Sequence, residues 1–272
     1  MVRKMNKLAY LVKFFLYALS NPKEGREVFR TKYQSMQGSS TSLYDYGSKQ
    51  KNLEDTIATL VPNSSVTIHD VMSNTKKLQS HISDFFASIK SEKYPSKKKP
   101  YPTEYSIDDQ SGLFLYMLCK ETTPNHVVET GVAYGQSSMY ILQALEENKK
   151  GSLHSIDAVF SPWQTKEMIG AAIPSNLKDK WNFNFGSATD KLNNILSSLG
   201  SVDIFLHDSL HTYKNMMFEF ETAWPYIAKG GFLVSDDIGD NNAFYDFCTK
   251  MKLDSIILKQ KTSSYLGIIK KP

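Results

Sequence analysis

The stretch HVVETGVAYGQSSMYILQ, residues 126–143, decides the fold. A short apolar run ends at Glu129, and a turn containing Gly131 and Gly135 follows it. From Ser137 onward the apolar residues have the spacing of a helix. Glycine lets the backbone turn tightly and lets a ligand approach closely, because it carries no Cβ. The free N–H groups at the start of the helix attract a carboxylate or a phosphate. The stretch therefore predicts a strand, a ligand-binding turn and a helix.

The sequence after residue 105 alternates between short apolar runs and segments with helical spacing. We predict strands over residues 126–129, 153–156, 181–185, 202–206 and 232–235, and helices over 107–120, 189–199 and 212–226. Continuous apolar strands with helical crossovers indicate a parallel sheet that is covered on both faces. Two final strands, 255–259 and 264–270, are joined by only a few polar residues. Such a short connection permits only an antiparallel hairpin.

The first 104 residues differ from the rest in charge. They carry 17 Lys/Arg against 9 Asp/Glu, whereas residues 105–272 carry 15 against 19. We predict a basic, mainly helical region over 1–104 and a separate α/β domain over 105–272. Helices are expected over 8–19, 24–33, 53–61 and 68–89, a loop over 34–52, and a linker rich in proline and lysine over 91–102. No recognised RNA-binding module accompanies the lysines, so no nucleic-acid partner is expected.

The apolar segment 8–19 is too short for a transmembrane helix, and Lys13 within it argues against a secretory signal. It either packs on the protein or lies as a basic amphipathic helix on a membrane surface, and we favour packing. Cys119 and Cys248 have no metal-binding spacing and suggest no disulfide framework. The expected location is cytoplasmic, with peripheral membrane contact through residues 1–22 as the open alternative.

Several polar residues follow the predicted strands, where a parallel sheet binds its ligands. Asp157, 22 residues after Gly135, can accept hydrogen bonds from both ribose hydroxyls of a nucleoside. This geometry serves NAD and S-adenosylmethionine (SAM) equally. Ser187 and Ala188 follow the third strand, where an adenine would lie, although Ser187 alternatively caps the next helix.

Two further segments, IFLHDSLHTY (204–213) and VSDDI (234–238), leave the ends of adjacent strands. They bring together His207, Asp208, His211, Asp236 and Asp237. Three carboxylates this close repel one another unless they are protonated, separated or bridged by a cation. An oxygen-rich site of this kind suits Mg²⁺ or Mn²⁺ rather than zinc.

The turn reads E-x-G-x-x-x-G, with Ala133 where a dinucleotide-binding turn has its second glycine. This motif resembles that of the class I SAM-dependent methyltransferases. Residues 105–272 resemble a branch that includes the macrocin-type sugar O-methyltransferases, through VVETGVAYGQSS, LHSID, FLHDSLHTY, GGFLVSDD and SYLGIIKK. The resemblance implies a Rossmann-like α/β fold, with a seven-stranded sheet of order 3-2-1-4-5-7-6 and an antiparallel terminal hairpin.

The resemblance also implies roles for individual residues. Those expected to bind SAM are Glu129, Gly131, Ala133, Tyr134, Gly135, Ser137, Asp157, Ser187 and Ala188. Asp208, Asp236 and Asp237 are expected to bind a Mg²⁺ or Mn²⁺ ion. Many relatives read F-(I/L)-D-G-D-H-S-Y after the fourth strand, whereas His207 takes the place of the first acid here. His211 is the expected general base, because an imidazole titrates near neutrality, and Asp208 assists it.

The predicted function is transfer of the SAM methyl group to an oxygen, less favourably a nitrogen, of a small polar acceptor such as a sugar. The basic N-terminal region is expected to cover the acceptor. Two alternatives remain open at this point. One is an NAD-dependent oxidoreductase, against which Ala133 and the terminal hairpin argue. The other is a non-catalytic protein with a SAM-binding fold at a membrane surface, against which the acidic cluster argues. A homo-oligomer is compatible with the sequence.

Overall fold

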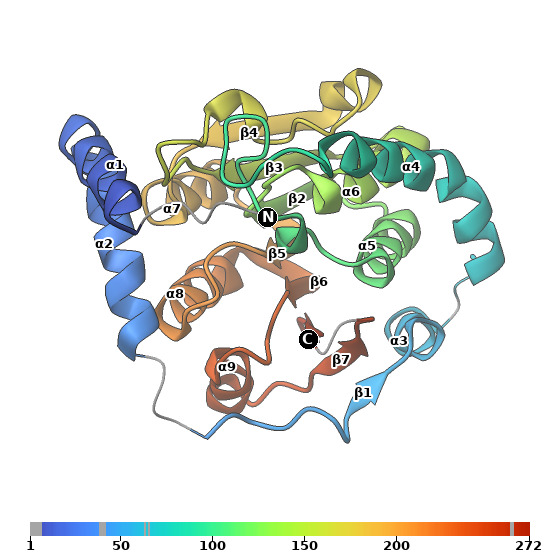
Figure 1. Ribbon diagram of the computed structural model, residues 1–272. Helices are drawn as coiled ribbons and strands as arrows, with labels where there is room; N and C mark the ends of the chain where they lie inside the picture. Colours follow the sequence, from blue (N-terminus) through green and yellow to red (C-terminus); the bar gives the residue numbers. More distant parts are fainter. Residues whose placement is uncertain (1–6, 38–41, 63, 65, 262–263) are drawn as a thin grey trace.

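A mixed eight-stranded sheet forms the centre of the protein in a computed structural model (Figure 1). The structure describes residues 7–37, 42–62, 64, 66–261 and 264–272. The strand order is β1-β7-β8-β6-β5-β2-β3-β4. The strands are β1 (Gln50–Lys51), β2 (His126–Thr130), β3 (Ser152–Asp157), β4 (Trp181–Phe185), β5 (Val202–His207), β6 (Ile227–Ser235), β7 (Ile256–Lys259) and β8 (Tyr265–Lys270).

The predicted parallel α/β sheet with an antiparallel terminal hairpin is confirmed. Strands β2 to β6 are mutually parallel, and β8 lies antiparallel to both β6 and β7. When β1 is left out and β2 to β8 are renumbered 1 to 7, the strand order matches the predicted 3-2-1-4-5-7-6. The eighth strand, β1, was not predicted, because residues 34–52 were interpreted as a loop. Instead, α2 extends to Gln37 and Gln50–Lys51 pairs in parallel with β7.

Helices cover both faces of the sheet, as Figure 1 shows. They are α1 (Lys7–Ser20), α2 (Pro22–Gln37), α3 (Leu53–Leu60), α4 (Ile68–Ile89), α5 (Asp109–Thr122), α6 (Gln136–Asn148), α7 (Ala188–Leu199), α8 (Tyr213–Ala223) and α9 (Ala243–Met251). The predicted helix over 68–89 is found with the same bounds. Helix α5 begins two residues later than predicted, because the Asp108 side chain accepts the Ser111 amide and caps it.

Alternate residues of each strand enter two separate cores, as the pleat of a strand requires. Val127 and Ile204 pack with α3, α4, α5 and α6. Val128 and Phe205 pack with α7, α8 and α9. Helices α3 and α4 therefore belong to the same core as the sheet. The division of the chain at residue 104 stays a prediction.

Helices α1 and α2 lie at the edge of the molecule, beside the loops that leave the sheet (Figure 1). The Tyr17 hydroxyl donates to the Val159 carbonyl oxygen (3.3 Å), and Phe14 lies edge-on against Trp163. On α2, Gln34 is buried and accepts a hydrogen bond from the Thr212 hydroxyl (2.9 Å). Within the described residues, none of the helices has the length and apolar character needed to cross a bilayer.

Candidate active site

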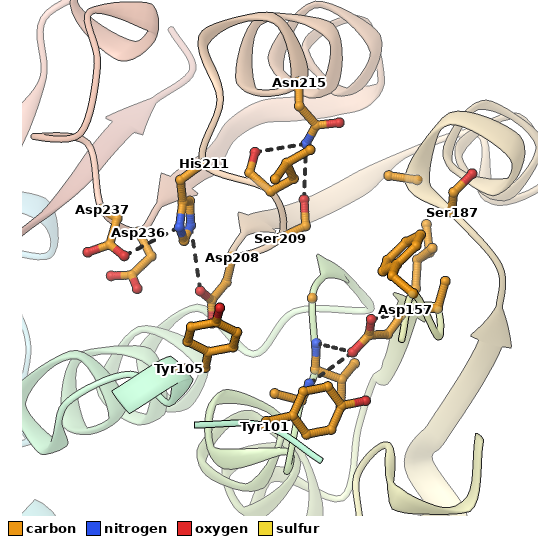
Figure 2. Close-up of a pocket in the computed structure, with 18 of the residues that line it drawn as sticks. Tyr101, Tyr105, Asp157, Ser187, Asp208, Ser209, His211, Asn215, Asp236 and Asp237 are labelled. Atoms are coloured by element: carbon orange, nitrogen blue, oxygen red, sulfur yellow. Dashed lines mark hydrogen bonds and ion pairs between the residues drawn. The ribbon is translucent and has the colours of Figure 1, made fainter. Parts of the chain in front are cut away.

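A cavity of about 690 Å³ opens at the carboxyl ends of β2 to β6. One part of its lining comes from the glycine turn after β2, from Asp157 and from residues 186–189. Another part comes from Asp208 and His211 after β5 and from the acids after β6. Figure 2 shows the two groups facing the same space. Parallel strands place their ligands at this edge of a sheet, so the position agrees with the topology.

The glycine turn comes very close to the loop after β5. Gly131 has a φ of 85°, and a Cβ there would lie 1.8 Å from the carbonyl oxygen of Asp208. Only glycine can occupy this position, because any side chain would overlap the backbone of the other loop. Ala133 also has a left-handed backbone, with a φ of 47°. The turn is therefore shaped by close backbone packing, and Gly131 and Ala133 both line the cavity.

Glu129 lies outside the cavity lining, although we expected it to contact the cofactor. It is completely buried, and its carboxylate accepts hydrogen bonds from the hydroxyls of Ser137 (3.1 Å), Ser138 and Ser155 (2.6 Å). Burial raises the pKa of Glu129 to about 7, against the opposing effect of the three hydroxyls. Its role in this structure is to join β2, α6 and β3 beneath the turn.

Three more of the expected cofactor residues also lie outside the lining. Tyr134 packs edge-on against Phe85, Phe86 and Tyr101, with ring centroids 5.3–5.8 Å apart. Gly135 has no room for a side chain, since a Cβ would meet the Ile173 side chain at 2.7 Å. Ser137 binds Glu129 as described. These residues fix the turn and the start of α6.

Asp157 is fastened to the glycine turn. Its Oδ2 accepts hydrogen bonds from the amides of Val132 (3.0 Å) and Ala133 (2.9 Å), and its Oδ1 accepts from Ala158 (2.7 Å). Burial raises the pKa of Asp157, while the three amides act in the opposite direction. Figure 2 shows the carboxylate between the turn and the cavity. A carboxylate oxygen can accept more than one hydrogen bond, and Oδ1 accepts only the Ala158 amide, so Asp157 keeps acceptor capacity for a ligand.

Ser187 combines the two roles proposed for it from the sequence. Its side chain accepts the Asp190 amide and caps α7 (3.3 Å). It also lines the cavity together with Gly186, Ala188 and Thr189. These residues lie across the cavity entrance from the acidic group.

Three acids surround His211 in the second half of the cavity (Figure 2). Its Nδ1 lies 3.3 Å from Oδ2 of Asp237, and its Nε2 lies 3.8 Å from Oδ1 of Asp208. Asp236 is buried, and its Oδ1 accepts a hydrogen bond from the Gln260 side chain (2.5 Å). The predicted convergence of Asp208, His211, Asp236 and Asp237 is therefore observed.

The surroundings of Asp208 and Asp236 disfavour the ionised form of each carboxyl group. Burial raises the pKa of Asp208 well above its usual range, and repulsion from Asp236 and Asp237 adds to this effect. Burial and Asp237 raise the pKa of Asp236 to about 7. Two neighbouring carboxylates cannot both ionise without a compensating charge. The site is therefore suited to a cation or to a shared proton.

Asp208, Asp236 and Asp237 do not form one ligand group in this structure. Among the described residues, Asp208, His211 and Asp236 bring ligand atoms within 4.8 Å of one another, and so do His211, Asp237 and Asp240. Asp237 has a left-handed backbone (φ 48°), and its Oδ1 accepts a hydrogen bond from the Ser264 hydroxyl. The Asp237 side chain consequently belongs to the second group, and His211 is common to both.

His207, which the sequence placed with this cluster, turns into the core instead. Its Nδ1 lies 2.6 Å from Glu219 on α8, and both side chains are completely buried. Glu219 also accepts hydrogen bonds from Thr130, from Ser209 (2.7 Å) and from Asn215 (2.9 Å). Burial acts to raise the pKa of Glu219, but His207 and these donors outweigh it and lower that pKa. Glu219 thus fixes the loop that carries Asp208 and His211.

Sequence reasoning missed Glu219, Gln260 and the aromatic residues of the cavity wall. Phe14 of α1, Val28 of α2, and Tyr101 and Tyr105 before α5 all line the cavity. Nothing in the local sequence marks Glu219 or Gln260, because each is a single polar residue whose partners lie on other elements.

Residues 128–238 match the sequence family described as a methyltransferase domain. The match, together with the antiparallel terminal hairpin, agrees with the prediction of a methyltransferase and not with the oxidoreductase alternative. A search of curated proteins found no match.

Solved structures with the same fold include an O-methyltransferase from Bacillus cereus in complex with SAH. It is 16% identical with a TM-score of 0.54, over 81% of this chain and 98% of that one. A methyltransferase from Geobacter sulfurreducens is 15% identical with a TM-score of 0.52, over 85% and 98%. The O-methyltransferase TomG from Streptomyces achromogenes, in complex with SAM, is 12% identical with a TM-score of 0.51, over 85% and 100%. These similarities establish the fold.

The buried Glu129 predicts a pH dependence of stability. Because its pKa is raised in the folded state, that state binds more protons than the unfolded chain between about pH 4 and pH 7. The free energy of unfolding should therefore fall as pH rises through this range. Glu129→Gln should remove part of the slope, on the order of 3 kcal/mol over the window. Urea unfolding at several pH values measures it. The exposed Glu54→Gln should keep the wild-type slope, and an unchanged slope in Glu129→Gln would contradict the assignment.

Proposed function

We propose that this protein transfers the methyl group of SAM to an oxygen of a small polar acceptor. One observation carries the proposal. A single cavity is lined on one side by the glycine turn with Asp157, and on the other side by His211 with its surrounding acids. The first side suits a nucleoside and the second suits a group that must lose a proton. The methyltransferase match over residues 128–238 supports the same reaction class.

Asp157 and the turn after β2 would hold the cofactor. The carboxylate of Asp157 is already oriented by three backbone amides, so little reorganisation is needed before it accepts the ribose hydroxyls. Gly186, Ser187 and Ala188 would contact the adenine. The SAH and SAM ligands of the Bacillus cereus and Streptomyces achromogenes proteins support this choice of cofactor.

Methyl transfer from a sulfonium is an in-line displacement. The acceptor oxygen forms a bond to the methyl carbon while the carbon–sulfur electron pair returns to sulfur, which leaves SAH. The proton of the acceptor must go to a base, and His211 is our candidate. Burial lowers the pKa of His211 to about 4, with His207 acting in the same direction, so the ring is neutral at pH 7. Its buried Nε2 has no hydrogen-bond partner among the described residues and can accept a proton. Catalysis would otherwise consist mainly of positioning.

A divalent cation fits the acidic side of the cavity. Asp208 and Asp236 would supply its carboxylate ligands, since their ligand atoms lie within 4.8 Å of each other and of His211, whose Nε2 would stay free to act as the base. The raised pKa values of both acids support a compensating positive charge at this place. Carboxylate oxygens favour Mg²⁺ or Mn²⁺. When bound, such an ion would lower the pKa of an acceptor hydroxyl and orient it. Asp237 and Asp240 would form the outer part of the site.

The acceptor would lie between the acids and the N-terminal helices. Phe14, Val28 and Tyr105 supply apolar and aromatic surface there, while Asp240 and Gln260 supply hydrogen-bonding groups. A sugar presents both hydroxyl groups and apolar C–H faces, so this mixture supports a sugar-like acceptor. Because residues of α1 and α2 line the cavity, we propose that these helices cover the acceptor.

Replacement of Asp157 tests the cofactor assignment. Asp157→Ala should weaken SAH binding by roughly 2–4 kcal/mol, because charge-assisted hydrogen bonds to two ribose hydroxyls are lost. Isothermal calorimetry with SAH measures the affinity, and circular dichroism verifies the fold. Asp179→Ala, an exposed acid outside the cavity, should bind SAH as the wild type does. Equal SAH affinities in the two variants would contradict the assignment of Asp157 to cofactor binding.

Removal of the cation tests the acidic site. Asp236→Asn should abolish Mn²⁺ binding, measured by electron paramagnetic resonance, while SAH affinity stays nearly unchanged because the ribose side is intact. Methylation of a responsive acceptor should stop in EDTA and return with Mg²⁺. The exposed Asp254→Asn should behave as the wild type. Full activity in EDTA would remove the cation from the mechanism.

Replacement of His211 tests the general base. His211→Ala should lower the rate of methyl transfer by about 10²–10⁴, since a positioned base contributes that much. The affinity for SAH should remain, and His69→Ala on the exposed side of α4 should have no effect. Single-turnover measurement of SAH formation separates the chemical step from product release. A wild-type rate in His211→Ala would show that another group accepts the proton of the acceptor hydroxyl.

A further inference from the structure

Helix α1 is apolar on two sides. Phe14 and Tyr17 face the protein, where Tyr17 binds the Val159 carbonyl oxygen and Phe14 lies against Trp163. Phe14 also lines the active-site cavity. This side is the packing surface that the sequence analysis favoured for residues 8–19. A helix that packs on a soluble domain through one side normally presents polar residues on the other.

The outer side of α1 is instead a continuous apolar stripe. Val12, Phe15, Leu16 and Leu19 have exposed fractions of 50%, 61%, 57% and 65%. Their spacing is i, i+3, i+4 and i+7, so they lie on one face of the helix. Single exposed apolar residues are common, but four adjacent ones on one helix face indicate an interaction surface.

The charge of the surrounding sequence indicates what covers the stripe. Residues 1–33 contain eight Lys/Arg and only two acids, Glu24 and Glu27. Lys13 is exposed beside Val12 on the helix. An apolar face with lysine at its border and a basic flank complements a surface that is both apolar and negatively charged. The surface of an anionic bilayer has these two properties.

The dimensions of α1 fit a position on a membrane but not across it. Its 14 residues span about 21 Å, less than the roughly 30 Å of a hydrocarbon core. Interfacial helices typically have phenylalanine and leucine on the face that enters the membrane, with cations beside it. Because α1 is already held to the domain by its inner face, it can dock without first folding, which lowers the entropy lost on binding.

We propose that the outer face of α1 docks on the surface of anionic lipid bilayers. Val12, Phe15, Leu16 and Leu19 enter the interface between headgroups and acyl chains, and Lys13 contacts lipid phosphates. The proposal does not depend on the methyl-transfer reaction. A second copy of this chain is the competing occupant of the same face.

Co-sedimentation of the full chain with vesicles tests the proposal. Vesicles of phosphatidylcholine and phosphatidylglycerol in a 3:1 ratio should bind the protein, and pure phosphatidylcholine should bind it much less. The bound fraction should fall between about 0.1 M and about 1 M salt, because counterions screen the attraction. The double variant Phe15→Asp, Leu16→Asp should reduce partitioning by about tenfold or more.

Met72→Asp is the matched control, because Met72 is an exposed residue (45%) on α4. It should bind vesicles as the wild type does, and both variants should keep the wild-type melting temperature. Retained vesicle binding in the double variant would overturn the proposal, and so would an absence of binding in the wild type. A dimer that dissociates in the double variant, with no vesicle binding, would assign the face to a second copy.

Discussion

The active site depends on the contact between two loops at the ends of β2 and β5. Gly131 approaches the Asp208 carbonyl so closely that no side chain fits between them, and the Asp208 amide donates to the Thr130 carbonyl oxygen (2.9 Å). The first loop carries the turn that Asp157 fastens, and the second carries Asp208 and His211. Their contact places the proposed cofactor and acceptor sites side by side. A methyl group can move between two molecules only when they are held at such short range.

A buried carboxylate fixes each of the two loops through hydrogen bonds. Glu129 accepts hydrogen bonds from three serine hydroxyls beneath the glycine turn. Glu219 is hydrogen-bonded to His207, Ser209 and Asn215 beneath the second loop. The pKa values of the two acids are shifted in opposite directions because their partners differ. Glu129 has only neutral donors and its pKa is raised, whereas Glu219 has an imidazole and its pKa is lowered. A buried carboxylate is tolerated only when donors surround it, so each of these acids favours one arrangement of its loop.

Most strands could be predicted because each is a short apolar run bounded by turn residues. Strand β6 begins five residues earlier than predicted, because the predicted strand starts after Gly230–Gly231 and the actual strand continues through these two glycines. Strand β1 could not be predicted, because its two residues acquire their structure only by pairing with β7. In the site, the motif residues Asp157, Asp208 and Asp236 reach the cavity as expected. The orientation of His207 and the partners of Asp236 depend on Glu219 and Gln260, which no local pattern marks.

The pairing of β1 with β7 joins Gln50 to Ile257 and thereby links the first quarter of the chain to its end. Helices α3 and α4 are synthesised before any of the parallel strands that they cover. During synthesis they lack the sheet on which their apolar faces pack, and the eight-residue α3 is too short to be stable alone. The sheet edge closes only after the terminal hairpin has formed. The apolar faces of the early helices therefore stay uncovered until the later strands are made, and exposed apolar surface of this kind favours aggregation.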